Sequence, residues 1–95
     1  MPKSSKPRTF ALHWGSGVIA EEAVFEGEHH VPALQLLEFT EGDAKGQLQV
    51  RFATYDHRGR FQRYPLILGE AEIAGLRAQL EQAPRLRELL RQLVQ

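Results

Sequence analysis

Hydrophobic and polar residues alternate over several short stretches in the first two thirds of this chain, whereas the last third has a helical spacing. The clearest alternation covers residues 47–55, where Val50 and Phe52 fall on one face. Arg51 and Tyr55 fall on the other face, which we expect to point outward. A period of two is typical of a strand with one buried face. Related patterns predict four more strands, at residues 10–14, 18–25, 33–40 and 61–68.

Glycine-rich and polar segments separate these strands and predict the turns between them. Residues 56–59, Asp-His-Arg-Gly, fit a type I turn closed by a glycine bulge, a common hairpin connection. Pro65 has no N–H group to donate, so the strand 61–68 is expected at an edge of the sheet or bulged near this residue. The other turns and loops are predicted at residues 15–17, 27–32 and 41–46.

The start of a helix is well marked in the last third. Gly69 can serve as its N-cap, and Glu72 stands at N3, where it can reach back to the N-cap amide. Apolar residues then recur at helical spacing until Pro84, which either kinks the helix or opens a second one. We expect the apolar stripe to pack against one face of the sheet. The order of elements predicts an α+β fold: an antiparallel β-meander of four to five strands followed by a C-terminal helix that is kinked or broken near Pro84.

Length and composition set the domain organisation. A chain of 95 residues fits one small domain, here 9–95, preceded by a flexible basic tail at 1–8. The chain has no cysteine, which excludes disulfides and thiolate–zinc sites and favours a cytoplasmic location. No apolar run is long enough to cross a bilayer, so no membrane association is expected.

The stripe after Pro84 is broader than a single small sheet can cover. We therefore expect a homodimer in which these residues meet a second chain. The alternative is that they cap the open end of the same core. The residues concerned are Leu86, Leu89, Leu90, Leu93 and Val94.

Charge is segregated along the chain although the formal net charge is zero. Residues 21–43 contain seven acidic residues and no lysine or arginine, whereas residues 45–63 contain five basic residues and one acidic residue. A basic face of this kind attracts polyanions. The alternative is that opposite charges pair across neighbouring strands and leave no field.

Catalytic and metal-binding motifs are absent from the sequence, so we expect neither an enzyme nor a cofactor. His29 and His30, beside Glu26 and Glu28, form the only cluster that resembles a metal site. Adjacent histidines on an extended chain point in opposite directions and rarely share one ion. No metal site is expected.

The second half of the chain, in particular residues 48–59 and 65–80, resembles the positive-cofactor-four (p15) transcription coactivators, whose fold is similar to that of the Whirly proteins. The shared features are a strand, a turn with glycine, and a second strand that leads straight into an acidic helix start. The resemblance implies a curved antiparallel sheet, a homodimer joined through the helices, and binding of single-stranded DNA on the sheet. The acidic stretch 21–43 has no clear counterpart in that family.

These observations predict a small dimeric protein that binds single-stranded nucleic acid in transcription or DNA metabolism. Basic side chains would contact phosphates and aromatic rings would stack on bases. Phe61 is an alternative to Tyr64, depending on register, and the opposing interpretation is that the rings are cross-strand core pairs and the arginines solvated edge charges. The alternative function is a protein–protein interaction or regulatory module that uses the acidic face and the leucine-rich helix. The predicted nucleic-acid contacts are Arg51, Tyr55, Arg58, Arg60, Arg63 and Tyr64.

Overall fold

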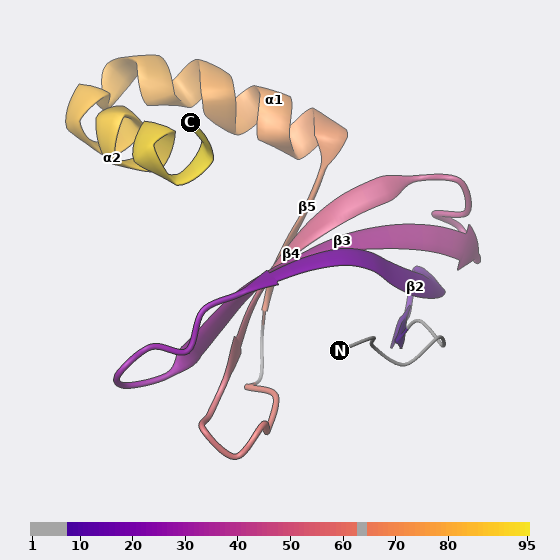
Figure 1. The fold of residues 1–95 in the computed structure, drawn as a ribbon. Coiled ribbons are helices and arrows are strands. Elements are labelled where there is room, and N and C mark those ends of the chain that lie inside the picture. Colours follow the sequence, from indigo (N-terminus) through magenta and orange to yellow (C-terminus); the bar gives the residue numbers. More distant parts are fainter. Residues whose placement is uncertain (1–7, 63–64) are drawn as a thin grey trace.

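Five antiparallel strands pair in the order in which they follow one another along the chain, so the sheet is a meander (Figure 1). The computed structural model describes residues 8–62 and 65–95. The sheet precedes two α-helices, which confirms the predicted α+β class with a break near Pro84. The strands are β1 (Thr9–Leu12), β2 (Gly15–Val24), β3 (Val31–Glu41), β4 (Leu48–Tyr55) and β5 (Leu66–Gly69).

The first turn lies earlier than the glycines predict. The chain turns at residues 13–14, and the predicted turn at 15–17 is wrong because these residues begin β2. Gly17 lies so close to β3 that a Cβ atom built on it would be 1.9 Å from the carbonyl oxygen of Glu38. This glycine therefore permits the close approach of two strands instead of a turn.

The later hairpins follow the sequence closely. Gly59 has a φ of +83° and its N–H donates a 3.0 Å hydrogen bond to the carbonyl of Asp56, as expected for a turn closed by glycine. The strand predicted at 61–68 is only partly formed: Phe61 makes an isolated bridge with Tyr55, and β5 begins at Leu66. β5 is an edge strand of the sheet, where Pro65 predicted it.

The two faces of the sheet differ in character. Directly opposed residues on neighbouring strands point to the same side. We call the side that carries Leu37 and Phe39 the inner face, because these residues form the buried core with Phe10 and Ala44. The opposite side is the outer face. Its cross-strand pairs include Ala23–Leu34, Leu34–Phe52, Phe52–Leu66, Leu36–Val50 and Val50–Leu68.

The alternation predicted for β4 is present, but its burial is the reverse of the expectation. Arg51 lies on the inner face and is only 9% exposed, whereas Phe52, on the outer face, is 38% exposed. The physical reason is that Arg51 stands opposite the buried Gln35 on the inner face, the side that also carries the core residues Leu37 and Phe39. The helices bury none of their residues, so they leave the outer face largely uncovered.

A bulge in β2 decides which acidic residue reaches the inner face. Ile19 opposes Leu37 and Glu21 opposes Leu36, so Ala20 is an extra residue without a partner on β3. The side-chain alternation therefore changes phase at Ala20. As a result, Glu22 points to the inner face and Glu21 to the outer face.

The C-terminal third forms two helices with a break at the predicted place. Helix α1 (Glu70–Gln79) is followed by the 3₁₀ turn η1 (Leu80–Gln82) and by α2 (Pro84–Val94). The Glu72 carboxylate accepts a 2.9 Å hydrogen bond from the N–H of Gly69, which confirms the predicted cap. Ala83 leaves the helical conformation and Pro84 occupies the first turn of α2, so the proline opens a second helix.

The helices do not cover the sheet, and the expectation that their stripe packs on one of its faces is wrong for the described chain. Neither helix contains a buried residue. Gly69 is both the last residue of β5 and the N-cap of α1, so α1 follows the strand without a loop. The two helices lie together to one side of the sheet, and Leu93, near the end of α2, borders a hollow with Leu34 and Phe52 of the outer face (Figure 1). Neither they nor any other helix of the described chain is long and apolar enough to span a membrane.

Candidate nucleic-acid interface

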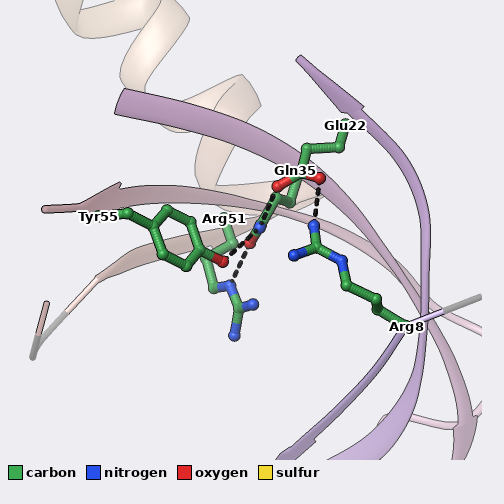
Figure 2. Close-up of polar contacts among 5 residues, drawn as sticks. All are labelled: Arg8, Glu22, Gln35, Arg51 and Tyr55. Carbon is green, nitrogen blue, oxygen red and sulfur yellow. Dashed lines mark hydrogen bonds and ion pairs between the residues drawn. The ribbon is translucent and has the colours of Figure 1, made fainter. Parts of the chain in front are cut away.

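A row of polar residues crosses three strands of the inner face. Glu22 on β2 opposes Gln35 on β3, and Gln35 opposes Arg51 on β4. Opposed residues on neighbouring strands point to the same face, so the strand pairing alone brings the three side chains together. Figure 2 shows them together with Tyr55 and Arg8 around the Gln35 amide.

Gln35 is the centre of this group and is only 1% exposed. Its amide nitrogen donates hydrogen bonds to Glu22 Oε2 at 2.7 Å and to the Tyr55 hydroxyl at 3.0 Å. Its amide oxygen accepts a 2.6 Å hydrogen bond from Arg51 Nε. Both amide hydrogens and the oxygen are thus used, which fixes the orientation of the amide and holds the arginine in place.

Arg51 is a buried cation whose direct partner is a neutral amide. Its guanidinium also stacks over the ring of Phe61, 4.9 Å from the centroid, and the rings of Tyr55 and Phe61 meet edge to face at 5.4 Å. Figure 2 shows the two terminal nitrogens directed away from Gln35. Within residues 8–62 and 65–95 these nitrogens have no hydrogen-bond acceptor. The guanidinium fork is therefore oriented and available to an anion.

Arg8, the last residue of the predicted basic tail, pairs with Glu22 at the margin of the same group. Partial burial alone would raise the pKa of Glu22. The hydrogen bonds from Gln35 and Arg8, with the charges of Arg8 and Arg51, outweigh this effect and lower its pKa. The hydrogen bond to Glu22 raises the pKa of Arg8 in turn. The remaining residues of the predicted tail, 1–7, lie outside the described residues.

The turn after β4 carries a second polar group. Asp56 Oδ1 accepts hydrogen bonds from the backbone N–H groups of Arg58, at 2.9 Å, and Arg60, at 2.8 Å. Its other oxygen pairs with Arg60 Nε at 2.6 Å. The backbone N–H of Arg60 is the largest of the contributions that lower the pKa of Asp56, and the Arg60 side chain adds to it. Arg58 is exposed, and its side chain has no ion pair in the described part of the chain.

A hollow of about 280 Å³ connects the two polar groups. It runs from the Arg8–Glu22 pair past Tyr55 to the turn at Asp56. A chain-like ligand lying on the inner face could follow this path from one group to the other. The residues that line the hollow are Arg8, Glu22, Val24, Glu26, Val31, Tyr55, Asp56, His57 and Gly59.

The structure brings some of the predicted contact residues together and separates others. Arg51 and Tyr55 join through Gln35, while Arg58 and Arg60 lie at the turn. Arg60 is paired with Asp56 of the same turn, whereas the alternative interpretation expected pairs across neighbouring strands. Arg63 and Tyr64 lie outside the described residues. The ring of Phe61 lies beside Tyr55. Phe61 is the residue that the sequence offers as the alternative to Tyr64, depending on the register of the strand.

Gln35, Glu22 and Arg8 are the members of this group that the sequence interpretation missed. The signal for Gln35 was present: it shares the odd-numbered positions of β3 with Ala33, Leu37 and Phe39, all of which are buried. A polar residue at such a position has to find hydrogen-bond partners inside the protein. Glu22 could not be found in this way, because the bulge at Ala20 changes the phase of the strand.

The five residues predicted to form a dimer interface are all exposed on α2. Among the described residues, no group of three or more histidine, aspartate or glutamate side chains could hold a metal ion.

Comparison with known proteins finds no relative of this chain. No family model matches the chain. No curated protein and no solved structure gives a significant match either. The resemblance to the positive-cofactor-four coactivators thus stays a prediction that depends on the residues quoted for it.

Proposed function

We propose that this protein binds single-stranded nucleic acid along the inner face of its sheet and acts in transcription or DNA metabolism, as a cytoplasmic homodimer. The observation that carries the proposal is the state of Arg51. Its Nε is fixed by Gln35, and its terminal nitrogens have no acceptor within the described residues. Because no buried side-chain nitrogen or oxygen of the described residues lacks a partner, these terminal nitrogens reach the surface, where a bound anion would complete their hydrogen bonds.

The surroundings of Arg51 suit a nucleotide strand better than a small anion. The fork of the guanidinium matches the geometry of a phosphate group. Phe61 and Tyr55, next to it, present aromatic surface on which a base can stack, worth roughly 1–3 kcal/mol per base. Stacking of this kind does not depend on the identity of the base, so we expect little sequence preference.

The number of unpaired cations bounds the strength of binding. Arg8 and Arg60 are each paired with a carboxylate, so phosphate contacts come first from Arg51 and Arg58. Two phosphate contacts to a single strand correspond to a slope of about −1.4 in the logarithm of the affinity against the logarithm of the salt concentration. Binding should therefore be weak at physiological salt and clear at low salt.

A fluorescence-polarisation titration with a labelled single-stranded DNA oligonucleotide tests the proposal. We expect saturable binding at low salt, weakening as salt is added, and weaker binding of a duplex of the same sequence. Titration of the matching RNA would show whether the sugar matters. An absence of binding at low salt would overturn the proposal.

The second candidate function is a protein-interaction or regulatory module. It is favoured by the helices, which contain no buried residue and expose the leucines of α2. Capture of a protein partner that survives the double substitution Arg51→Ala and Arg60→Ala would favour this function over nucleic-acid binding.

A further inference from the structure

The outer face of the sheet carries apolar side chains that the described chain leaves largely uncovered. Phe52 is 38% exposed, Leu66 is 55% exposed, and Leu34, Leu36, Val50 and Leu68 are half-buried. These residues form two adjoining cross-strand rows, so their exposed surface is continuous. An apolar patch of this extent on a small protein marks a contact surface.

Helix α2 presents the complementary surface. It has a strongly one-sided distribution of leucines, and none of its residues is buried. Leu89 is 63% exposed and Leu90 is 40% exposed. Only the end of the helix comes close to the sheet of its own chain, where Leu93 borders a hollow of about 370 Å³ with Phe25, Leu34 and Phe52. The other leucines of the stripe are exposed.

The charges at the margins of the two surfaces are opposite. Glu21 and Glu38 point to the outer face, beside Leu36 and Leu48 of the neighbouring strands, and have no ion pair among the described residues. On α2, Glu88 is paired with Arg91, whereas Arg85 and Arg87 have no ion pair in the same set of residues. A basic, leucine-rich helix thus matches an acidic-edged apolar sheet surface.

We infer that α2 of one copy packs on the outer face of a second copy, and that the second copy returns the same contact. Such an exchange is self-complementary and closes as a twofold dimer. It differs from the helix-to-helix dimer implied by the family resemblance, because each helix meets a sheet. It also gives the acidic residues of β2 and β3 a role. The inner face stays free, so the inference does not depend on nucleic-acid binding.

The absence of cysteine from the chain allows a direct test by disulfide trapping. Leu36→Cys places a thiol on the outer face and Leu90→Cys places one on α2. When the two single variants are mixed and oxidised, we expect a linked dimer that contains one chain of each kind. Gln47→Cys, on the exposed β3–β4 loop, replaces Leu36→Cys as the control and should give no specific link with Leu90→Cys.

The other possible occupants of the outer face give different products. Efficient linking of Leu90→Cys to itself would indicate helix-to-helix contact and overturn the inference. A link within one chain of the double variant, without a link between mixed single variants, would show that α2 folds onto its own sheet and would overturn it equally. A monomer mass for the unmodified protein, measured by light scattering at micromolar concentration, would also overturn the inference.

Charge reversal provides an independent test that leaves the apolar surface intact. The double variant Arg85→Glu, Arg87→Glu should raise the dissociation constant of the dimer about tenfold or more. Mixing it with Glu21→Lys, Glu38→Lys should restore association, measured by sedimentation, while each variant alone associates weakly. Circular dichroism of each variant checks that it is folded. Failure of the mixture to associate, with both variants folded, would overturn the pairing.

Discussion

Arg51 Nε donates a 2.6 Å hydrogen bond to Oε1 of Gln35, a side chain that is almost completely buried. The two residues stand directly opposite each other on β3 and β4. A neutral amide orients the arginine without cancelling its charge, in contrast to the carboxylates that pair with Arg8 and Arg60. The same contact therefore supports both the fold and the proposed anion site.

Substitution of Gln35 should destabilise the sheet. Gln35→Met keeps most of the side-chain volume but removes the acceptor of Arg51 Nε and both donors of the amide. We expect the free energy of unfolding to fall by about 2–4 kcal/mol, because a buried charged group loses its partner. Urea denaturation measures this. Gln79→Met, at an exposed position of α1, is the control and should change it by less than about 0.5 kcal/mol. An equally small loss for Gln35→Met would mean that water replaces the amide at no cost.

Two glycines should respond in opposite directions to the addition of a methyl group. Gly17→Ala places a Cβ 1.9 Å from the carbonyl oxygen of Glu38, so the strands β2 and β3 have to separate. We expect a loss of about 3 kcal/mol or more in the free energy of unfolding. Gly75, inside α1, has open space where a Cβ would lie, with no neighbouring atom within 4 Å, and Gly75→Ala should add about 0.5–1 kcal/mol through helix propensity. Thermal denaturation of the two variants distinguishes them, and a stable Gly17→Ala protein would contradict the close approach of the strands.

Acid should remove part of the stability through Glu22. The pKa of Glu22 is lower in the folded protein than in the unfolded chain, where it is about 4.3. Its contribution is therefore complete above the unfolded pKa and is lost as the pH falls through the folded pKa. Glu22→Gln should flatten the decline of the unfolding free energy as the pH falls below the unfolded pKa of glutamate, about 4.3. Glu81→Gln, on the exposed turn η1, is the control and should retain the slope of the unmodified protein.

Arg58 should contribute to nucleic-acid binding through charge alone. Arg58→Ala is expected to reduce the steepness of the salt dependence by about 0.7, the value for one phosphate contact to a single strand. The fold should be unaffected, because the side chain is exposed and the turn is held by its backbone N–H. Arg77→Ala removes the same charge from α1 and should leave the slope unchanged. Equal slopes for all three proteins would exclude Arg58 from the interface.

The hairpins and the helix start could be predicted because their signals are local. Asp56 and Gly59 build their turn from neighbouring backbone groups, and Glu72 caps α1 across three residues. The first turn was predicted at the wrong residues, because the close approach of β2 to β3 at Gly17 involves Glu38, which lies far along the chain. The direction of burial in β4 failed for a similar reason. Alternation separates Arg51 from Phe52 but does not say which of them faces the core.

The sequence by itself determined the α+β class, the break at Pro84 and the amphipathic character of α2, because each depends on the spacing of residues close together in the chain. Only the tertiary structure decided that Glu22, Gln35 and Arg51 share one face and that the helices leave the sheet uncovered. The first follows from the register of three strands and a bulge at Ala20. The second concerns packing between segments far apart in the chain, which local spacing does not determine.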